Sequence, residues 1–341
     1  MSSSIFKIET VDHLNFVAHG LIAASLLNAS IRIGLFDALR DAEKSTEELG
    51  EQLNLDRRAT LALLSPLASL GLLERDGTLW KNSDISEKYL VKGTPSYMGT
   101  YFARTMYEGQ YNQMGKLMDV LEGEKPLEKG ILTYGEEWRA NAPTMIPGQH
   151  EGSLATARYL MKKKVLDLSK ASAFLDLGCG SGAYSIAACQ AHPTLRACCV
   201  DFEEILEVTK EYIESNGLSD RITTQALSYL DDPLPKGYDA VWFGGTLNGY
   251  SAQQIKTIFE KVHAVLPEGG ILAMYEYFIF DDRTGPLFST LMNLNSLVGS
   301  SDAQILTLGE MQKLLLETGF KDVRHEPLIR EMTWLFFAHK I

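Results

Sequence analysis

The chain has 341 residues, of which 45% are hydrophobic and 22% charged. This composition is typical of a globular protein, and the length is sufficient for more than one hydrophobic core. The formal net charge is -12 at pH 7, which disfavours a nucleic-acid partner because phosphate binding needs clustered Lys and Arg. Neither a basic leader followed by a long apolar run nor a stretch of about 18 apolar residues occurs, so we expect a cytoplasmic protein without a membrane span.

The N-terminal region has a helical pattern followed by a short hairpin. Apolar residues recur at helical spacing from Val11 to Leu39, with few charges, which predicts a buried helix that packs in the chain or against a second subunit. A helix-start signature occurs at Ser45-Thr-Glu-Glu48, a second amphipathic helix runs from Leu61 to Leu73, and Asp76-Gly77 marks a tight turn. Helix, turn, helix and hairpin form a winged-helix pattern.

A winged helix can bind DNA, but its presumed recognition helix carries only Arg57 and Arg58 near its start. A structural or dimerising role is therefore favoured, and we expect a homodimer. Helical segments follow from about Tyr97 to Tyr159, interrupted by glycines and by Pro143 and Pro147. We expect a winged-helix domain at 1–95, a helical connector that lines a substrate pocket at 96–165, and a third region at 166–341.

Short β-rich runs alternate with helical patterns from Ala173 onward, which indicates βαβ units and a parallel sheet. The expected strands are Ala173 to Leu177, Ala197 to Val200, Arg221 to Gln225, Ala240 to Phe243 and Gly270 to Tyr275, followed by a hairpin of Lys321 to Leu328 and Thr333 to His339. The cysteines Cys179, Cys189, Cys198 and Cys199 form no metal-ligand spacing, so we expect reduced packing thiols and no metal site.

The stretch Phe174-Leu-Asp-Leu-Gly-Cys-Gly-Ser-Gly182 joins the first of these strands to a helix. Its glycines let the backbone turn sharply and approach a ligand closely. A relaxed dinucleotide fingerprint also fits, with Asp201 at the spacing for a ribose. Asp176 before the loop, which can meet an ammonium group, and the preceding helical region favour S-adenosylmethionine over a nicotinamide cofactor.

Several motifs together resemble the two-domain small-molecule O-methyltransferase family over nearly the whole chain. They are the Asp176 to Gly182 loop, Asp201, Gly217-Leu-Ser-Asp-Arg221, Pro233-Leu-Pro-Lys-Gly-Tyr-Asp239, Pro267-Glu-Gly-Gly270, Glu276, Thr307-Leu-Gly-Glu310 and Glu317-Thr-Gly-Phe320. The resemblance implies a Rossmann-like α/β class I methyltransferase sheet, a dimerising winged-helix module and a substrate pocket between the domains. The donor site that it implies consists of Asp176, Gly178, Gly180, Gly182, Asp201, Phe202, Ser228, Tyr229 and Gly244.

The sequence departs from this family at two places. The family's Leu-His-Asp-Trp, in which His removes a proton from the substrate hydroxyl, is here Leu247 to Tyr250, with Asn248 in place of the His. An amide orients a substrate but takes no proton near neutral pH. The family's Gly-Asp for the adenine is Ala226-Leu227, so Ser228 or Tyr229 is expected to substitute.

Three interpretations of the missing base remain open at this stage. The acceptor carries no proton that must be removed, or another residue such as His150 acts as the base, or the chain has lost methylation and binds the donor for another purpose, such as regulation. His150 can equally be an ordinary hydrogen-bonded helix residue. We expect the catalytic set to be Asn248, His150 and Glu276.

A basic and aromatic set in and after the connector suits a small anionic acceptor, since arginine binds carboxylates and aromatic faces stabilise a sulfonium. We expect the acceptor site to include Arg104, Tyr107, Tyr134, Arg139, Met145 and Asn295. A thioether carboxylic acid such as 4-methylthio-2-hydroxybutyrate would use both features without a base. That combination resembles the methylthiohydroxybutyrate S-methyltransferases of dimethylsulfoniopropionate synthesis, with an O-, N- or C-methyltransferase of secondary metabolism as the alternative.

Overall fold

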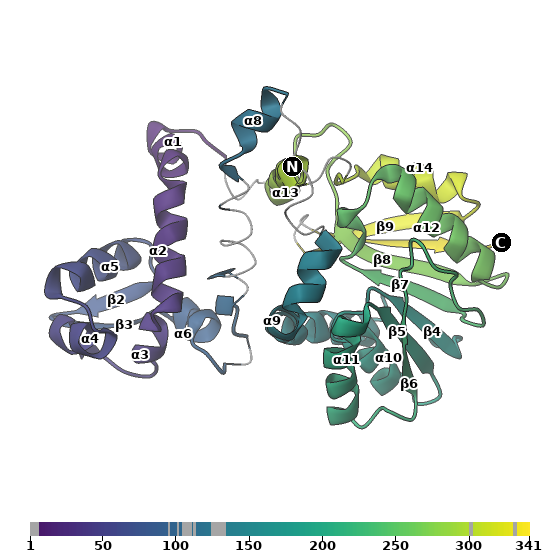
Figure 1. Ribbon diagram of the computed structural model, residues 1–341, viewed down its shortest axis with the longest axis horizontal. Helices are drawn as coiled ribbons and strands as arrows, with labels where there is room; N and C mark the ends of the chain where they lie inside the picture. Colours follow the sequence, from purple (N-terminus) through teal and green to yellow (C-terminus); the bar gives the residue numbers. More distant parts are fainter. Residues whose placement is uncertain are drawn as a thin grey trace. The chain divides into compact units, whose positions relative to one another are not determined.

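The computed structural model describes residues 7–94, 96–100, 102–103, 111, 114–123, 134–299, 303–329 and 333–341. The chain forms two compact units, Met1–Gly115 and Lys116–Ile341 (Figure 1). In the connector that we expected at 96–165, the long helix Tyr134–Lys162 packs within the second unit, and the division of the chain into three regions stays a prediction.

The first unit combines helices with a small antiparallel sheet in the order β1-β3-β2. Its helices are α1 (Val11–Ala18), α2 (Gly20–Arg32), α3 (Leu35–Ala38), α4 (Thr46–Leu53), α5 (Arg57–Ser69) and α6 (Asp84–Leu90), and its strands are β1 (Lys44–Ser45), β2 (Leu73–Asp76) and β3 (Leu79–Asn82). Ser45 and Glu48 form the expected capping box of α4. The helices α4 and α5 with the β2–β3 hairpin make the winged-helix arrangement that the sequence predicts.

The single buried helix expected from Val11 to Leu39 is wrong. The segment forms three helices: α1 and α2 are separated at His19, and α2 and α3 are separated at Gly34, whose backbone is left-handed. Apolar side chains of α1 and α2 are exposed in this chain, with Val11 at 73% and Ile22 at 65%. No single helix in the described ranges is long and apolar enough to cross a membrane. The pair α1 and α2, bent by 52° at their junction, is together long and apolar enough by length and composition alone.

The second unit has a sheet whose described strands follow the order β6-β5-β4-β7-β8-β10-β9. The strands are β4 (Ala173–Leu177), β5 (Arg196–Asp201), β6 (Ile222–Ala226), β7 (Ala240–Gly244), β8 (Ile271–Tyr277), β9 (Lys321–Ile329) and β10 (Thr333–His339). Strands β4 to β8 pair in parallel, and β10 pairs antiparallel with β8 and β9. The expected strands and the C-terminal hairpin are therefore confirmed.

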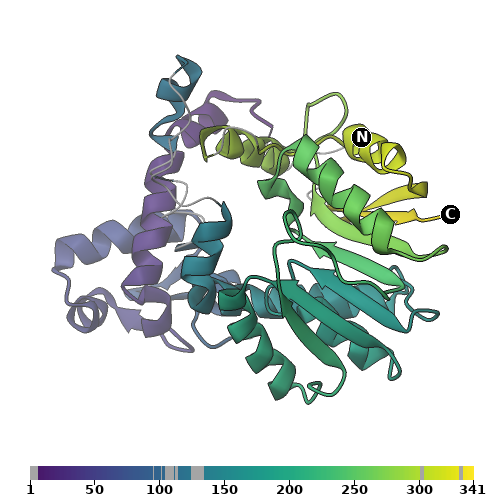
Figure 2. The same ribbon diagram turned by 45° about the vertical axis from the view of Figure 1, so that its right-hand side comes forward.

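Helices cover both faces of this sheet (Figures 1 and 2). The described helices of the second unit are α8 (Leu117–Leu121), α9 (Tyr134–Lys162), α10 (Ala183–Ala191), α11 (Glu203–Ser215), α12 (Ala252–Val265), α13 (Leu287–Gly299) and α14 (Leu308–Glu317), with a 3-10 turn at Leu247–Gly249. Alternate strand residues explain the two layers. Phe174 and Trp242 share a core with α9, α10 and α11, whereas Leu175 and Phe243 pack with α12 and α14.

The helical break that we expected at Pro143 and Pro147 is also wrong, because α9 continues through both prolines. A proline removes one helical hydrogen bond and normally kinks or ends a helix. Here Ala142 and Ile146 are buried at 0% and 2% exposure against α11. Tertiary packing of this face thus outweighs the local preference.

Candidate active site

The glycine loop follows β4, at the carboxyl ends of the parallel strands. Backbone N–H groups of Gly178 and Cys179 both donate to the Val200 carbonyl, at 2.8 and 3.1 Å. Gly178 has φ +71°, and a Cβ at this position would lie 2.5 Å from the Thr246 methyl group. Only glycine meets both constraints, and the contact brings the loop against the turn that follows β7.

Two buried carboxylates support this loop. Asp201 accepts the N–H groups of Gly180 at 3.0 Å and Phe202 at 2.9 Å, and burial raises its pKa to about 6. Asp176 accepts the Ser185 hydroxyl at 2.8 Å, and burial raises its pKa to about 7. Both groups lie where a positively charged ligand would favour their ionised form.

The turn after β7 is ordered by a third buried carboxylate. One oxygen of Glu276, on β8, accepts the N–H groups of Thr246 at 2.6 Å and Leu247 at 2.8 Å. Its other oxygen accepts the Asn248 side-chain amide at 2.7 Å. Glu276 is 1% exposed, and this burial raises its pKa to about 8 against the opposing effect of the backbone bonds.

The Glu276 contact fixes which atom of Asn248 remains available. Because the NH₂ group donates to the carboxylate, the amide oxygen is the free end of the side chain. An amide oxygen accepts a hydrogen bond from O–H or N–H but does not become a proton carrier at neutral pH. The structure thus joins two residues of the expected catalytic set, Asn248 and Glu276.

His150, the third member of that set, lies on α9 beside the glycine loop. It is 4% exposed, its Nδ1 is 2.8 Å from the Ser181 hydroxyl oxygen, and its ring stacks on Tyr212 at 3.7 Å between centroids. Burial lowers the pKa of His150, so its ring is neutral near pH 7.

The loop after β6 contains Ser228 and Tyr229. The Ser228 hydroxyl donates to Asp231 at 2.8 Å, while Tyr229 is buried, with its ring edge-on to Phe243 and Tyr250. This loop is fixed by Lys261 of α12, whose ammonium donates to the carbonyls of Tyr229, Leu230 and Asp232 at 2.9, 2.8 and 2.5 Å. No local sequence pattern indicates this role for Lys261, because the role depends on contacts between distant segments.

Gly244 ends β7, and it lies against two aromatic side chains. A Cβ there would lie 2.9 Å from the Trp242 indole nitrogen and 3.0 Å from the Tyr184 ring. The Trp242 Nε1 and the Asn295 amide oxygen, on α13, are buried atoms without a hydrogen-bond partner within the described ranges. A buried polar atom without a partner is costly, and such atoms are suited to meet a ligand.

Of the remaining expected acceptor residues, Arg139 is the one whose side chain lies within the described residues. Arg139 forms a surface ion pair with Glu204, at 2.9 Å, and lies over the Phe202 ring. Tyr134 and Met145 belong to α9, but their side chains are outside the described residues, as are Arg104 and Tyr107 altogether.

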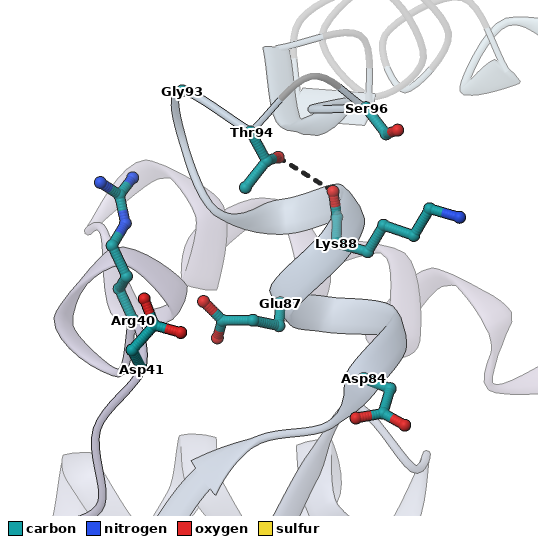
Figure 3. A pocket seen from close by; sticks show the side chains of 8 residues that line it. All are labelled: Arg40, Asp41, Asp84, Glu87, Lys88, Gly93, Thr94 and Ser96. Atoms are coloured by element: carbon teal, nitrogen blue, oxygen red, sulfur yellow. Dashed lines mark hydrogen bonds between the residues drawn. The ribbon is translucent and has the colours of Figure 1, made fainter.

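A separate polar depression occurs on the first unit (Figure 3). Its lining residues are Arg40, Asp41, Asp84, Glu87, Lys88, Gly93, Thr94 and Ser96. The Thr94 hydroxyl donates to the Lys88 carbonyl at 2.9 Å. The acidic and basic side chains of this depression are interspersed and mostly exposed. The depression therefore differs from the second unit, where the carboxylates beside the glycine loop are buried.

Family models match both units. Residues 136–321 match the O-methyltransferase domain, and residues 16–92 match the O-methyltransferase dimerisation domain. The chain belongs to the O-methyltransferase family, and it is an enzyme. The fold and cofactor class expected from the glycine loop are therefore confirmed.

Individual relatives cover nearly the whole chain. The 3-hydroxy-5-methyl-1-naphthoate 3-O-methyltransferase of Streptomyces sahachiroi is 32% identical, over 91% of this chain and 90% of its own length. The N,N-dimethyltransferase OxyT of Streptomyces rimosus is 27% identical, over 93% of each. The structure of human N-acetylserotonin methyltransferase in complex with SAM, at 22% identity and a TM-score of 0.84, covers 100% and 99% and shows the same fold.

Proposed function

We propose that this S-adenosylmethionine-dependent methyltransferase methylates a ring-bearing small molecule of secondary metabolism at oxygen, nitrogen or carbon, without a histidine base. The observation that carries this proposal is the 2.7 Å bond from the Asn248 amide to Glu276. Asn248 orients the nucleophilic group of the acceptor through its amide oxygen, and the acceptor reacts in a form from which the protein need not remove a proton before methyl transfer; a proton left on the methylated nitrogen or ring carbon goes to water afterwards.

The second unit has the features that a methyl donor of this charge requires. The methyl donor would be held by Asp176, Asp201 and the backbone of the Gly178 to Gly182 loop. Its adenine ring would be flanked by Ser228 and Tyr229. When bound, S-adenosylmethionine supplies a methyl group already activated by the positively charged sulfur. The buried carboxylates favour that charge, and their raised pKa values are those expected for acids that lack a cationic partner.

The acceptor end explains how a base can be dispensed with. A phenol with a pKa of about 10 is mostly protonated at neutral pH, and Asn248 cannot remove that proton. A neutral amine, an activated carbon or a phenol that is already ionised supplies its own electron pair to the methyl group as the bond from the methyl group to sulfur breaks. Any proton on the methylated nitrogen or carbon is then released to water, so alignment of the two reactants and exclusion of water during the transfer are the main requirements. Glu276 is assigned to holding the turn after β7 and not to proton removal, because its two oxygens accept three hydrogen bonds from that turn and its side chain is buried.

The relatives support an aromatic acceptor. Their names include a naphthoate O-methyltransferase and an N,N-dimethyltransferase, and a further relative is named L-tyrosine C(3)-methyltransferase. The thioether carboxylic acid expected from the sequence has no support among these names. In addition, Arg139, one of the two arginines expected to bind its carboxylate, is paired with Glu204.

The partner assignment follows the same evidence. The dimerisation-domain match supports a homodimer, and the exposed apolar residues of α1 and α2 supply a surface for it. The four buried free thiols are compatible with a cytoplasmic location, where cysteines stay reduced. A regulator that binds DNA is disfavoured, because Arg57, one of the two arginines of the presumed recognition helix α5, forms an ion pair with Glu47.

The test uses labelled S-adenosylmethionine with a panel of hydroxylated aromatic acids, aromatic amines and 4-methylthio-2-hydroxybutyrate. We expect the label to be transferred to the aromatic members of the panel. The pH dependence of the rate should follow the ionisation of the acceptor itself. Transfer only to the thioether acid would overturn the acceptor class, and donor binding without transfer to any member would favour a regulator.

Asn248→Ala separates orientation from donor binding. We expect kcat to fall about 10-fold to 100-fold, as for the loss of one or two hydrogen bonds in the transition state, with unchanged donor affinity. Asn248→His should introduce an ionisation between pH 6 and 7 into the rate profile for a phenolic acceptor. Asn216→Ala, on the far end of α11, is the matched control, and an unaltered kcat in Asn248→Ala would contradict the assigned role.

A further inference from the structure

One face of α9 lies along α11. Arg139, Ala142, Ile146 and His150 are spaced by three, four and four residues, so they share one side of the helix. The middle two pack against Ile205 and Val208 of α11 in a small apolar cluster. Arg139 and His150 lie at the two ends of this face.

Both ends of the face contact a segment of the donor site. Arg139 reaches Glu204 and the Phe202 ring, and Phe202 donates its N–H to Asp201. His150 reaches the hydroxyl of Ser181, the residue between Gly180 and Gly182 in the loop. A single helix therefore holds the two backbone segments that Asp201 ties together.

The His150 end has the stronger physical basis. The Arg139–Glu204 pair is exposed, at 44% and 45% of the two side chains, where an ion pair contributes little. The His150 and Ser181 side chains are buried at 4% and 6% exposure, where a hydrogen bond is poorly replaced by water. Stacking on Tyr212, with an interplanar angle of 16°, restricts the plane of the His150 ring, and the contact with Ser181 selects the orientation that places Nδ1 at the loop.

We propose that His150 is a positioning residue of the donor site, which holds the glycine loop in its binding conformation through the Ser181 hydroxyl. This proposal rests on the proposed function, because its effect is measured on the methyl donor. The loop then enters the bound state already ordered, so binding does not include the entropic cost of fixing the Gly180 to Gly182 backbone.

The experiment compares S-adenosylhomocysteine affinity by calorimetry in wild type, His150→Ala, Ser181→Ala and the double variant. We expect each single variant to bind about 10-fold more weakly, equivalent to one buried hydrogen bond. The double variant should bind no more weakly than either single variant, because both remove the same contact. His192→Ala, at the other end of α10, is the control and should bind as wild type does.

Conservative replacement distinguishes positioning from mere space filling. The amide nitrogen of Asn occupies nearly the place of the imidazole Nδ1, whereas that of Gln lies farther out. His150→Asn should therefore recover part of the lost affinity, and His150→Gln should not. Ser181→Ala and His150→Asn also carry the test if His150→Ala does not fold.

Three results would overturn the inference. They are wild-type affinity in Ser181→Ala, fully additive losses in the double variant, and loss of an ionisation from the kcat profile of His150→Ala with donor affinity intact, which would make His150 a base. Failure of the wild-type chain to bind the donor would instead refute the proposed function, so the two failures are distinguishable.

Discussion

Asp201 and Glu276 do similar structural work at two ends of the site, with different consequences. Each is buried near the end of a parallel strand, and each accepts two backbone N–H groups: Asp201 from Gly180 and from the next residue, Phe202, and Glu276 from Thr246 and Leu247. At Asp201 the carboxylate orders backbone only. At Glu276 it also fixes the side chain of Asn248.

The difference shows which end of the site can change. In the site that we propose, the donor end would be built from main chain, and Gly178 admits no side chain beside Thr246. The proposed acceptor end would present one replaceable side chain, Asn248, on a turn whose backbone is held by Glu276. Methyl donation and acceptor chemistry are thus separated along the sequence although the two segments touch.

The largest effect is expected for Asp201→Ala. Two backbone N–H groups lose a charged acceptor, and each such bond contributes about 1.5 to 3 kcal/mol, so donor affinity should fall at least about 100-fold. Calorimetry with S-adenosylhomocysteine measures this, and Asp220→Ala, which changes an exposed aspartate at the opposite, amino end of the parallel strands, is the control. A loss below about 3-fold would show that the loop does not depend on Asp201.

An intermediate effect is expected for Glu276→Gln. Its amide oxygen can still accept the N–H groups of Thr246 and Leu247, but its NH₂ group faces Asn248 and forces that amide to turn over. Asn248 would then offer a donor in place of an acceptor. We expect kcat to fall about 10-fold or more with donor affinity unchanged, because the change is confined to the acceptor end.

Steady-state kinetics with saturating donor would measure this loss, and thermal unfolding would confirm the fold. Since burial raises the pKa of Glu276 to about 8, the neutral glutamine should not destabilise the protein at pH 9. A variant that loses donor affinity as much as turnover would break the distinction between the two ends.

The smallest effect is a pH dependence of donor binding. Burial raises the pKa of Asp201 to about 6 and of Asp176 to about 7, so the unliganded folded state binds protons that the unfolded chain has released. Stability of the unliganded protein should therefore fall as pH rises from about 4 to about 7. A cationic donor favours the ionised carboxylates, and its affinity should rise several-fold over the upper part of this range.

The donor-induced shift in melting temperature at pH 5.5 and at pH 8 measures this dependence. S-adenosylhomocysteine, which lacks the sulfonium charge, should show a shallower dependence than S-adenosylmethionine. A donor-induced shift that is constant or decreases toward pH 8 would contradict the role given to the two aspartates.

Local sequence patterns predicted the fold well where the pattern determines structure directly. Buried strands such as Ala173–Leu177 and the glycine loop after it are determined by alternation and by chain geometry. Two features were not predicted. The helix continues through Pro143 because of packing against a distant segment. The division of Val11 to Leu39 into three helices depends on turns at His19 and Gly34 that the apolar periodicity does not indicate.

The site divides in the same way. Asp176 and the glycines belong to one contiguous stretch, and Asp201 ends the next parallel strand, so their placement at the same end of the sheet was predictable. The Asn248 contact with Glu276 and the Lys261 contacts with the Tyr229 loop join segments about 30 residues apart. No local pattern encodes them.

The shared carboxylate at Glu276 has a consequence for how such an enzyme can diversify. Because the turn after β7 keeps its backbone through Thr246 and Leu247 regardless of the residue at 248, exchanges at that one position are buffered against misfolding. A saturation library there, combined with varied acceptors, would sample new reactivity without sacrificing the inherited donor site, which makes position 248 a natural point of entry for laboratory evolution.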